Sequence, residues 1–315
     1  MNEQKIVVTG GAGFIGSHLS HKLADMGYKV LIIDNLFRGR LQYIEDLLNA
    51  GKASFVNGDI RDLDLVRKAI HGSSYVFHDA AVCINYSLAA PEESMDINLR
   101  GSFNVFKAAL EAGVKKVVFA SSASVYGNPI RLPMSEDHPL NPITPYCVSK
   151  IADEFLLKMF SNQGLKYIAL RNFNVYGPRQ STDAYYTSVI LSFVKKISNN
   201  SSPVILGDGS QSMDFVNIHD VVDANILAME SDVENEVFNV GSGTSTSVRE
   251  LAETIIELFR SSVKPTYVEE QKIIVRRRQA DITKINRLLG FKPKVEIKDG
   301  LKDVVSDILA KPSYY

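Results

Sequence analysis

A short β-branched strand that runs directly into three spaced glycines constrains the fold more than any other feature of this sequence. The segment Lys5–Thr9 is followed by Gly10, Gly13 and Gly16, and the pattern over Phe14–Met26 is helical. Such glycines permit a tight turn, a close approach of backbone N–H groups to a pyrophosphate, and close packing of the helix on the strand. We therefore expect a strand, turn and helix that bind a dinucleotide, with the helix N-terminus facing its phosphates.

Strand and helix patterns alternate along the first half of the chain. The other expected strands are Lys29–Ile33, Ala53–Asn57, Tyr75–Phe77, Lys116–Ala120 and Lys166–Leu170, and the expected helices include Leu63–Ile70 and Leu99–Ala112. Continuous apolar strands are what a parallel sheet covered on both faces requires. The sequence therefore predicts an α/β fold with a Rossmann-type, doubly wound parallel sheet.

The second half of the chain has a looser pattern. Its expected elements are helices over Ala184–Ser198 and Asp220–Met229 and strands at Val204–Leu206, Asp214–Asn217 and Glu236–Val240. We expect a dinucleotide-binding domain and a smaller C-terminal cap that binds the substrate. The domain comprises residues 1–173, with residues 214–242 returning to it, and the cap comprises residues 174–213 and 243–315.

Charge and composition exclude several classes of partner. The net charge of −1 offers no general attraction to nucleic acid or to an anionic membrane surface. No apolar stretch approaches the roughly 20 residues that span a bilayer, and the polar start Met1–Lys5 is unlike a signal peptide. Cys83 and Cys147 lie far apart and form no metal-spaced pair. We expect a cytoplasmic protein with no metal site and no nucleic-acid or membrane partner.

The end of the second strand carries a candidate ribose-binding acid. Asp34 stands about 20 residues beyond the glycine turn, where a carboxylate accepts both ribose hydroxyls of NAD and repels the 2′-phosphate of NADP. Arg38 and Arg40 lie close by, but the acid favours NAD. Asp59 and Ile60, past the third strand, are expected beside the adenine, although a turn or capping role for Asp59 is an equally good interpretation.

A tyrosine and a lysine four residues apart mark a candidate catalytic helix. Tyr146 and Lys150 share one helix face. A phenol with its usual pKa of about 10 is a poor base at neutral pH, but a neighbouring ammonium and the positive nicotinamide of NAD⁺ favour phenolate. The fifth strand ends in Ser121 and Ser122, which place a hydroxyl near the same substrate oxygen. The pair alone is typical of an exposed helix, but together these features indicate a catalytic set.

These segments together resemble the NAD-dependent sugar epimerase/dehydratase family of extended short-chain dehydrogenases/reductases, and especially its UDP-glucose 4-epimerase-like members. The likeness extends over nearly the whole chain, through Thr9–Gly16, Asp34–Asn35, Gly58–Ile60, His78–Ala81, Asn98, Ser121–Gly127, Tyr146–Lys150, Arg171–Arg179, Asp208–Gly209 and Ala280–Lys284. It implies an NAD-dependent enzyme of polysaccharide biosynthesis that acts on a nucleotide-diphosphate sugar. It also implies a homodimer or higher homo-oligomer, formed through helices around Asn98–Ala112 and Tyr146–Ser161.

The resemblance also implies roles for individual residues. Ser122 is the catalytic hydroxyl, Tyr146 the base, and Lys150 the partner of the base. The implied cofactor-binding residues are Gly10, Gly13, Phe14, Ile15, Gly16, Asp34, Asn35, Asp59, Ile60, Ala80, Ala81, Asn98, Tyr146, Lys150 and Phe173, and Asn98 also supports the active-site helix. The implied substrate-binding residues are Ser122, Asn174, Arg179 and Arg276.

The residues after the catalytic serine limit the reaction. Dehydratases of the family place an Asp-Glu pair there and related decarboxylases a Glu, whereas Ala123 and Ser124 cannot supply the acid and base of an elimination. The Cys/His pair of GDP-fucose synthases is not recognisable either, because Cys147 points away from the face of Tyr146. Oxidation and reduction at C4 remain. We expect a 4-epimerase, with a 4-dehydrogenase that releases a 4-keto sugar or a non-catalytic NAD-binding scaffold as alternatives.

Two arginines of the family pattern are missing. UDP-sugar epimerases hold the diphosphate with an arginine in an Arg-Asp-Phe/Tyr segment and another before an Ala-Asp-x-Ser-Lys stretch. Here Met213 takes the first place, and the loop Glu270–Val275 has no arginine before Arg276. Each such charge-assisted hydrogen bond contributes roughly 1.5–3 kcal/mol. Either Met213 packs in the core and Lys272 or one of Arg276–Arg278 holds the diphosphate, or the substrate lies outside the common UDP-hexoses.

Overall fold

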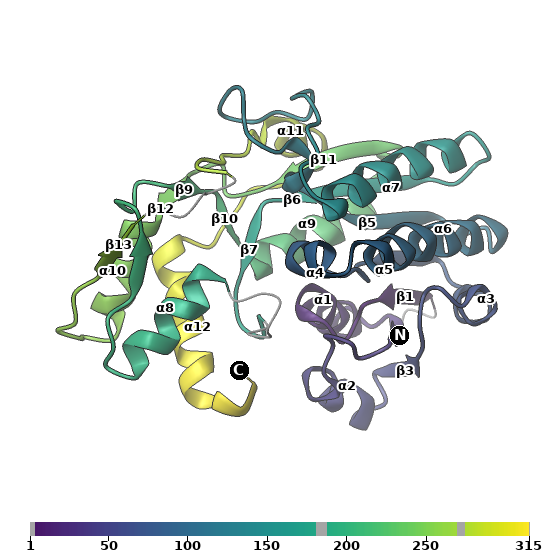
Figure 1. The fold of residues 1–315 in the computed structure, drawn as a ribbon. Helices are drawn as coiled ribbons and strands as arrows, with labels where there is room; N and C mark the ends of the chain where they lie inside the picture. Colours follow the sequence, from purple (N-terminus) through teal and green to yellow (C-terminus); the bar gives the residue numbers. More distant parts are fainter. Residues whose placement is uncertain (1–3, 181–187, 270–274, 315) are drawn as a thin grey trace.

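A computed structural model describes residues 4–180, 188–269 and 275–314 of the chain (Figure 1). A helix-covered sheet makes up most of the molecule, and a smaller group of helices stands at one end of it. Among the described residues, no helix is both long and apolar enough to cross a membrane.

The main sheet has seven strands, all parallel. They run in the order β11-β6-β5-β4-β1-β2-β3, so the chain starts near the middle and winds outward in both directions. This confirms the predicted Rossmann-type, doubly wound sheet. The strands are β1 (Lys5–Thr9), β2 (Lys29–Asp34), β3 (Ala53–Asn57), β4 (Tyr75–His78), β5 (Lys116–Ser122), β6 (Tyr167–Asn172) and β11 (Glu236–Val240).

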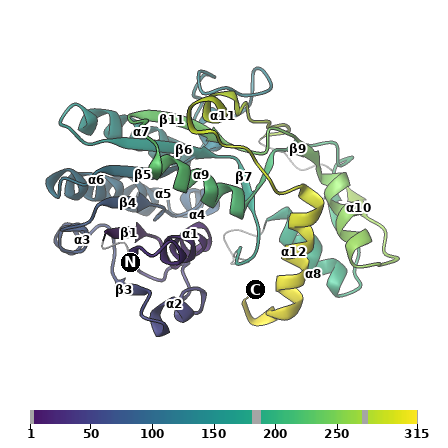
Figure 2. The same ribbon diagram turned by 180° about the vertical axis from the view of Figure 1, so that it is seen from behind.

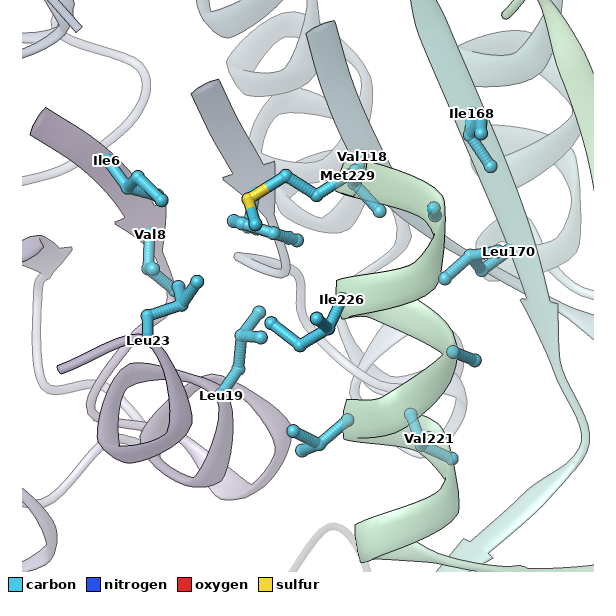
Figure 3. Close-up of a cluster of buried hydrophobic side chains, with 14 of the residues drawn as sticks. Ile6, Val8, Leu19, Leu23, Val118, Ile168, Leu170, Val221, Ile226 and Met229 are labelled. Carbon is cyan, nitrogen blue, oxygen red and sulfur yellow. The ribbon is translucent and has the colours of Figure 1, made fainter. Parts of the chain in front are cut away.

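One face of the sheet is covered by α1 (Phe14–Asp25) and α9 (Ile218–Glu230). Figure 3 shows Leu19 and Leu23 of α1 lying toward β1, and Ile226 and Met229 of α9 filling the space between α1 and the central strands. The short helix α11 (Thr283–Leu289) adds Ile285 and Leu289 to the same cluster. This apolar layer anchors the helix that begins at the glycine turn.

The opposite face is covered by α3 (Leu63–Ile70), α6 (Gly101–Glu111) and α7 (Pro145–Ser161). The start of α7 is fixed locally, because the Thr144 hydroxyl accepts a hydrogen bond from the Cys147 N–H and proline opens the helix. The shorter helices on the way are α2 (Glu45–Asn49), α4 (Ile84–Ala89) and α5 (Pro91–Met95), and one π-helical turn, Asp96–Arg100, leads into α6.

The smaller group of helices has its own apolar core. Its helices α8 (Val189–Ser198), α10 (Val248–Leu258) and α12 (Ile297–Ala310) bury Leu191, Leu251 and Leu301 against one another, and both ribbon views place the three helices beyond one end of the sheet (Figures 1 and 2). Three two-stranded pairs complete this region, β10 (Phe215–Asn217) with β7 (Asn174–Tyr176), β12 (Thr246–Ser247) with β9 (Ser212–Met213), and β13 (Thr266–Val268) with β8 (Val204–Leu206).

Most differences from the predicted elements occur at their ends. Strands β2, β4, β5 and β6 run one or two residues further than predicted, into the residues that follow each buried run. The helix predicted over Leu99–Ala112 begins only at Gly101, after the π-helical turn. Of the helix predicted over Ala184–Ser198, the structure has Val189–Ser198, and its first residues lie outside the described ranges. The division into a domain and a cap stays a prediction.

Candidate active site

The glycine turn after β1 forms a cradle that side chains would fill. Gly10 has a φ of 70°, and a Cβ there would lie 2.7 Å from the backbone nitrogen of Ala80. A Cβ at Gly16 would collide with the carbonyl oxygen of Gly10. The turn leads straight into the N-terminus of α1, where Gly13 precedes the first helical residue. The geometry therefore fits a dinucleotide pyrophosphate, which needs close backbone approach and the helix N-terminus.

Asp34 ends β2 at the mouth of this cradle. Its carboxylate accepts hydrogen bonds from the Ala12 N–H at 3.0 Å and the Leu36 N–H at 2.8 Å. Burial raises the pKa of Asp34, and the two backbone donors oppose that rise. The side chain lines the same cleft as the glycine turn, and each oxygen retains a lone pair for a ribose hydroxyl.

Asp59 combines the two roles that the sequence left open. Its carboxylate accepts the backbone N–H of Arg61 in a turn, and it is also bound by the Arg61 guanidinium at 3.0 and 2.7 Å and by the Asn35 amide at 3.2 Å. The Arg61 hydrogen bond is the main reason that the pKa of Asp59 lies below its usual value. Asp59, Asn35 and Ile60 all line the cleft.

One continuous cleft joins the cradle to the predicted catalytic residues. It runs along the carboxyl ends of the central strands, where ligands bind in doubly wound sheets. Of the residues predicted from the sequence, the cleft is lined by Gly10, Gly13, Phe14, Ile15, Gly16, Asp34, Asn35, Asp59, Ile60, Ala80, Ala81, Ser122, Tyr146, Lys150, Phe173, Asn174 and Arg179.

The predicted catalytic residues meet where β5 ends and α7 begins. Ser122 is the last residue of β5, Tyr146 lies in the first turn of α7, and both line the cleft. The Lys150 ammonium donates to the Ala120 carbonyl oxygen at 2.7 Å and lies 5.8 Å from the centre of the Tyr146 ring. The arrangement can hold a hydroxyl-bearing substrate carbon between a phenol, a hydroxyl and a nearby positive charge.

Burial disfavours the charged forms of both Tyr146 and Lys150, and the joint effect of Lys150 and NAD⁺ on the phenol stays a prediction. Burial raises the pKa of Tyr146, and the main opposing contribution comes from the Ser122 hydroxyl. Burial also lowers the pKa of Lys150, and its ammonium is directed to a backbone oxygen.

Asn98 was predicted to bind the cofactor. Its side chain lies behind the cleft and does not line it. Its amide oxygen accepts from the Val82 N–H at 2.8 Å, and its amide nitrogen donates to the Val82 oxygen at 3.2 Å and the Ser149 hydroxyl at 3.3 Å. The π-helical turn that contains it directs the fully buried side chain into the packing between α7 and the loop after β4. Its predicted support of the active-site helix matches these contacts.

Two buried carboxyl groups near Lys150 did not emerge from the sequence patterns. Asp79 follows β4, and no hydrogen-bond partner of its carboxylate is found among the described residues. Burial raises the pKa of Asp79 to about 7, and the charge of Lys150 opposes the rise. Burial likewise raises the pKa of Asp153, and the charge of Lys150 opposes that rise. The position of Asp153 one helical turn after Lys150 was the available sequence signal for it.

Asn174 and Arg179 border the far side of the cleft. The Asn174 amide donates to the Asp214 carbonyl oxygen at 3.1 Å. Arg179 has a positive φ of 64°, and one guanidinium nitrogen lies 3.1 Å from the Tyr43 carbonyl oxygen and 3.4 Å from the Ser17 hydroxyl. These contacts hold the Arg179 guanidinium against α1, close to the cradle.

Arg276 does not line this cleft, and its predicted role in substrate binding stays a prediction. Arg276 is exposed and lines a neighbouring hollow together with Arg131 and Arg277, whereas Arg278 lines the main cleft. The backbone of the run is held by Ser212, whose N–H donates to the Arg276 carbonyl oxygen at 3.0 Å and whose carbonyl oxygen accepts from the Arg278 N–H at 3.0 Å.

The structure gives a mixed result for the two positions without arginine. Met213 is half-buried on β9, belongs to no buried apolar cluster, and lines neither hollow, so the core-packing interpretation is wrong. Lys272 and most of the loop before Arg276 lie outside the described residues. Of the cations proposed to replace the missing arginines, Arg278 is therefore the one that the described structure brings into the cleft.

Comparison with known proteins gives consistent matches over the whole chain. The model of the NAD-dependent epimerase/dehydratase family matches residues 6–241. A UDP-glucose 4-epimerase of Mycolicibacterium smegmatis is 36% identical over 96% of this chain and 97% of its own length. Solved structures agree. The UDP-glucose 4-epimerase of Thermotoga maritima with UDP-glucose has a TM-score of 0.92 and 36% identity, covering 98% of this chain and 100% of the other.

A third relative differs in its ligand. The UDP-N-acetylglucosamine 4-epimerase of Methanobrevibacter ruminantium, solved in complex with UDP-N-acetylmuramic acid, has a TM-score of 0.94 and 37% identity, covering 99% of this chain and 100% of the other. Proteins with different sugars thus share this fold at similar distances from the chain.

Proposed function

The chain belongs to the NAD-dependent epimerase/dehydratase family, and on that premise we propose that it is a nucleotide-sugar 4-epimerase. It is an NAD-dependent enzyme of the extended short-chain dehydrogenase/reductase type. The observation that carries the proposal is the meeting of Ser122, Tyr146 and Lys150 in one cleft with the glycine cradle. This geometry suits transfer of a proton and a hydride at a single carbon.

The proposed mechanism assigns one task to each residue. The Tyr146 phenolate accepts the proton of the sugar C4 hydroxyl, while the Ser122 hydroxyl donates a hydrogen bond to the same oxygen. Lys150, fixed by the Ala120 carbonyl oxygen, contributes a nearby positive charge. NAD held by the glycine cradle and Asp34 would supply the acceptor for the C4 hydride and a positive charge that favours the phenolate. For epimerisation, the 4-keto sugar presents its other face, the hydride returns to C4, and Tyr146 returns its proton to the oxygen.

We propose that the cleft residues divide between the two ligands. The cradle, Asp34, Asn35, Asp59 and the cleft-lining residues of the same end hold NAD, since they surround the dinucleotide-shaped part of the cleft. Asn174 and Arg179 serve the nucleotide sugar from the opposite side. Asn98 acts indirectly, by holding Val82 and Ser149 in place.

The residues after Ser122 favour epimerisation over elimination. Ala123 is buried, and Ser124 places a hydroxyl at the cleft. Neither side chain can exchange protons as an acid or a base at neutral pH, which loss of the C6 hydroxyl requires at this position.

We further propose that two copies pair through α6 and α7. Phe103 of α6 and Val148, Phe155 and Met159 of α7 are large apolar side chains that are exposed in the single chain. Their helices lie side by side on one face of the sheet (Figure 1). Burying such residues is a main driving force for a stable dimer. Light scattering should give twice the chain mass, and Phe155→Arg should shift the protein to the monomer. A wild-type monomer at high concentration would contradict the pairing.

A panel of UDP-, GDP-, dTDP- and CDP-sugars tests the proposed activity directly. The NAD-loaded enzyme should convert one sugar into an equilibrium mixture of its C4 isomers, seen by NMR, without net formation of NADH. Stoichiometric NADH with a 4-keto product would establish a 4-dehydrogenase instead. If no sugar and no cofactor changes, the protein is a non-catalytic NAD-binding scaffold.

A further inference from the structure

Arg278 is a half-buried cation whose Nε has no hydrogen-bond partner among the described residues. Its side chain lines the cleft with Ser122, Ser124 and Tyr146, and its Nε is shielded from solvent without a hydrogen-bond partner. Burial lowers the pKa of this arginine, and the nearby Cys147 thiol opposes that effect. An unpaired guanidinium in such a place is costly.

Other cations near the site have partners in the protein. Arg171 is paired with Glu154 at 2.6 Å, Arg61 with Asp59 at 2.7 Å, and the Lys150 ammonium donates to a carbonyl oxygen. Arg278 lines the cleft without such a partner at its Nε among the described residues, so it remains available to a ligand.

An acid that binds the backbone next to Arg278 already has its partners. Asp214 accepts the N–H of Ala280, two residues after Arg278, together with the N–H groups of Ser242 and Gly243. Its oxygens therefore fix the backbone that carries Arg278 and do not neutralise the guanidinium. Among the described residues no carboxylate pairs with the Arg278 guanidinium, which leaves it for an anionic group of a bound molecule.

The position of Arg278 separates it from the cofactor phosphates. The cradle follows β1, whereas the backbone around Arg278 is bound to segments that follow β5 and β11. Gln279 accepts from the Met134 N–H at 2.8 Å and donates from its side chain to the Gly243 oxygen at 2.9 Å. Strands β5 and β4 stand between β6 and β1 in the sheet. Arg278 also has Cys147 as its neighbour, one residue past the proposed base.

We propose that Arg278 binds a carboxylate carried by the sugar of the substrate, so that the enzyme acts on an acidic nucleotide sugar. This inference rests on the proposed function for the identity of the second ligand. A planar guanidinium matches a carboxylate with two parallel hydrogen bonds, and a water-poor site strengthens both of them. The diphosphate is the other anion of such a substrate, and the experiment separates the two sources.

The test compares matched pairs of ligands by calorimetry on the NAD-loaded enzyme. The pairs are UDP-glucuronic acid with UDP-glucose and UDP-N-acetylmuramic acid with UDP-N-acetylglucosamine, and UDP alone reports the diphosphate. The variants are Arg278→Gln and Arg278→Lys, and Arg287→Gln, on the exposed side of α11, is the control. Binding is measured without turnover, so the result does not depend on whether the enzyme epimerises any sugar.

At least one acid should bind the unmodified enzyme more tightly than its neutral partner. Arg278→Gln should weaken the binding of that acid by about 10- to 100-fold, the effect of losing charge-assisted hydrogen bonds. The affinities for the neutral sugar and for UDP should stay nearly unchanged. Arg278→Lys should restore part of the affinity, because lysine keeps the positive charge but lacks the two parallel N–H donors of the guanidinium. The inference is overturned if neither acid is preferred, if the preference survives in Arg278→Gln, or if UDP and the neutral sugars weaken as much as the acid.

Discussion

Two arginines close to the active site, one in the sheet and one at the cap side, have opposite surroundings. Arg171 on β6 donates to both carboxylate oxygens of Glu154, at 2.9 and 2.6 Å, and to the Tyr126 hydroxyl at 2.8 Å. Burial lowers the pKa of Arg171, but the bonds from Glu154 and Tyr126 raise it overall. Arg278 has the burial without the partners.

The difference shows how the two regions divide the work. Around Arg171 the sheet region satisfies its polar groups, since Glu154 also accepts from the Ser121 hydroxyl at 2.6 Å and Tyr126 donates to Asn239 at 2.6 Å. This closed network fixes the ends of β5 and β6, where Ser122 stands. On the cap side, Arg278 lacks such partners among the described residues, and we infer that a ligand supplies them. Changes in the sheet should therefore affect chemistry and folding, and changes at the cap side should affect binding.

Tyr146→Phe should give the largest change. The loss of the proposed base should lower kcat by about 100-fold or more, while NAD and the nucleotide sugar still bind. Steady-state kinetics measure kcat, and bound-cofactor fluorescence measures NAD binding. Tyr75→Phe, at the start of β4, is the control. A variant with nearly normal kcat would remove Tyr146 from the mechanism.

Glu154→Ala and Arg278→Met should separate the two arginines by stability. Glu154→Ala leaves Arg171 buried without its partner and should lower the free energy of unfolding by about 3–5 kcal/mol. Arg278→Met removes an unpaired buried charge and should leave that free energy unchanged or raise it by up to about 2 kcal/mol. Denaturant unfolding without nucleotide sugar measures both. A large loss of stability in Arg278→Met would mean that the protein itself pairs this arginine.

Asp34→Ala should have a moderate effect that is confined to the cofactor. Removing a carboxylate that binds ribose should weaken NAD binding by roughly tenfold, as expected for hydrogen bonds to a charged group. It should also narrow the preference for NAD over NADP. Titrations of the apoenzyme with both cofactors measure the change, and the affinity for nucleotide sugar should stay the same. If the unmodified enzyme prefers NADP, then Arg38 or Arg40 outweighs the acid.

The buried His78 should give the smallest effect, seen in the pH dependence of stability. Burial lowers the pKa of His78 to about 3, and the charge of Lys150 adds to this. The folded protein therefore keeps the ring neutral, while the unfolded chain takes up a proton below about pH 6.5. The stability that this provides is present above pH 6.5 and is lost as the pH falls toward 3.

Between pH 7 and 5, the wild type should lose about 1–2 kcal/mol more stability than His78→Asn, which has no such group to titrate. Thermal or denaturant unfolding at several pH values measures the difference between the two proteins. Parallel curves over this range would contradict a neutral buried ring at position 78.

The sheet region was largely predictable from the sequence, because local patterns determine it. Continuous apolar strands, spaced glycines and the end position of Asp34 follow from backbone geometry that any such sheet requires. The strand ends were predicted too short, since Ser122 and Asn172 continue the hydrogen bonding of neighbouring strands beyond the apolar runs. Asp79 was missed because a lone aspartate after a strand has no pattern of its own.

The cap side was harder to predict because its contacts join distant segments. The sequence showed a run of three arginines but could not tell which one enters the cleft. That choice depends on the backbone of Ser212 and on Asp214, which lie about 65 residues earlier in the chain. The sequence favoured Arg276, and the structure favours Arg278.

A nucleotide sugar that carries deuterium at C4 tests the central claim most directly. The enzyme, loaded with unlabelled NAD, should give both C4 isomers with the deuterium still at C4, because the same hydride leaves and returns within one active site. NADH should not accumulate beyond the bound cofactor. Loss of deuterium from C4, or NADH formed in proportion to substrate, would contradict the account.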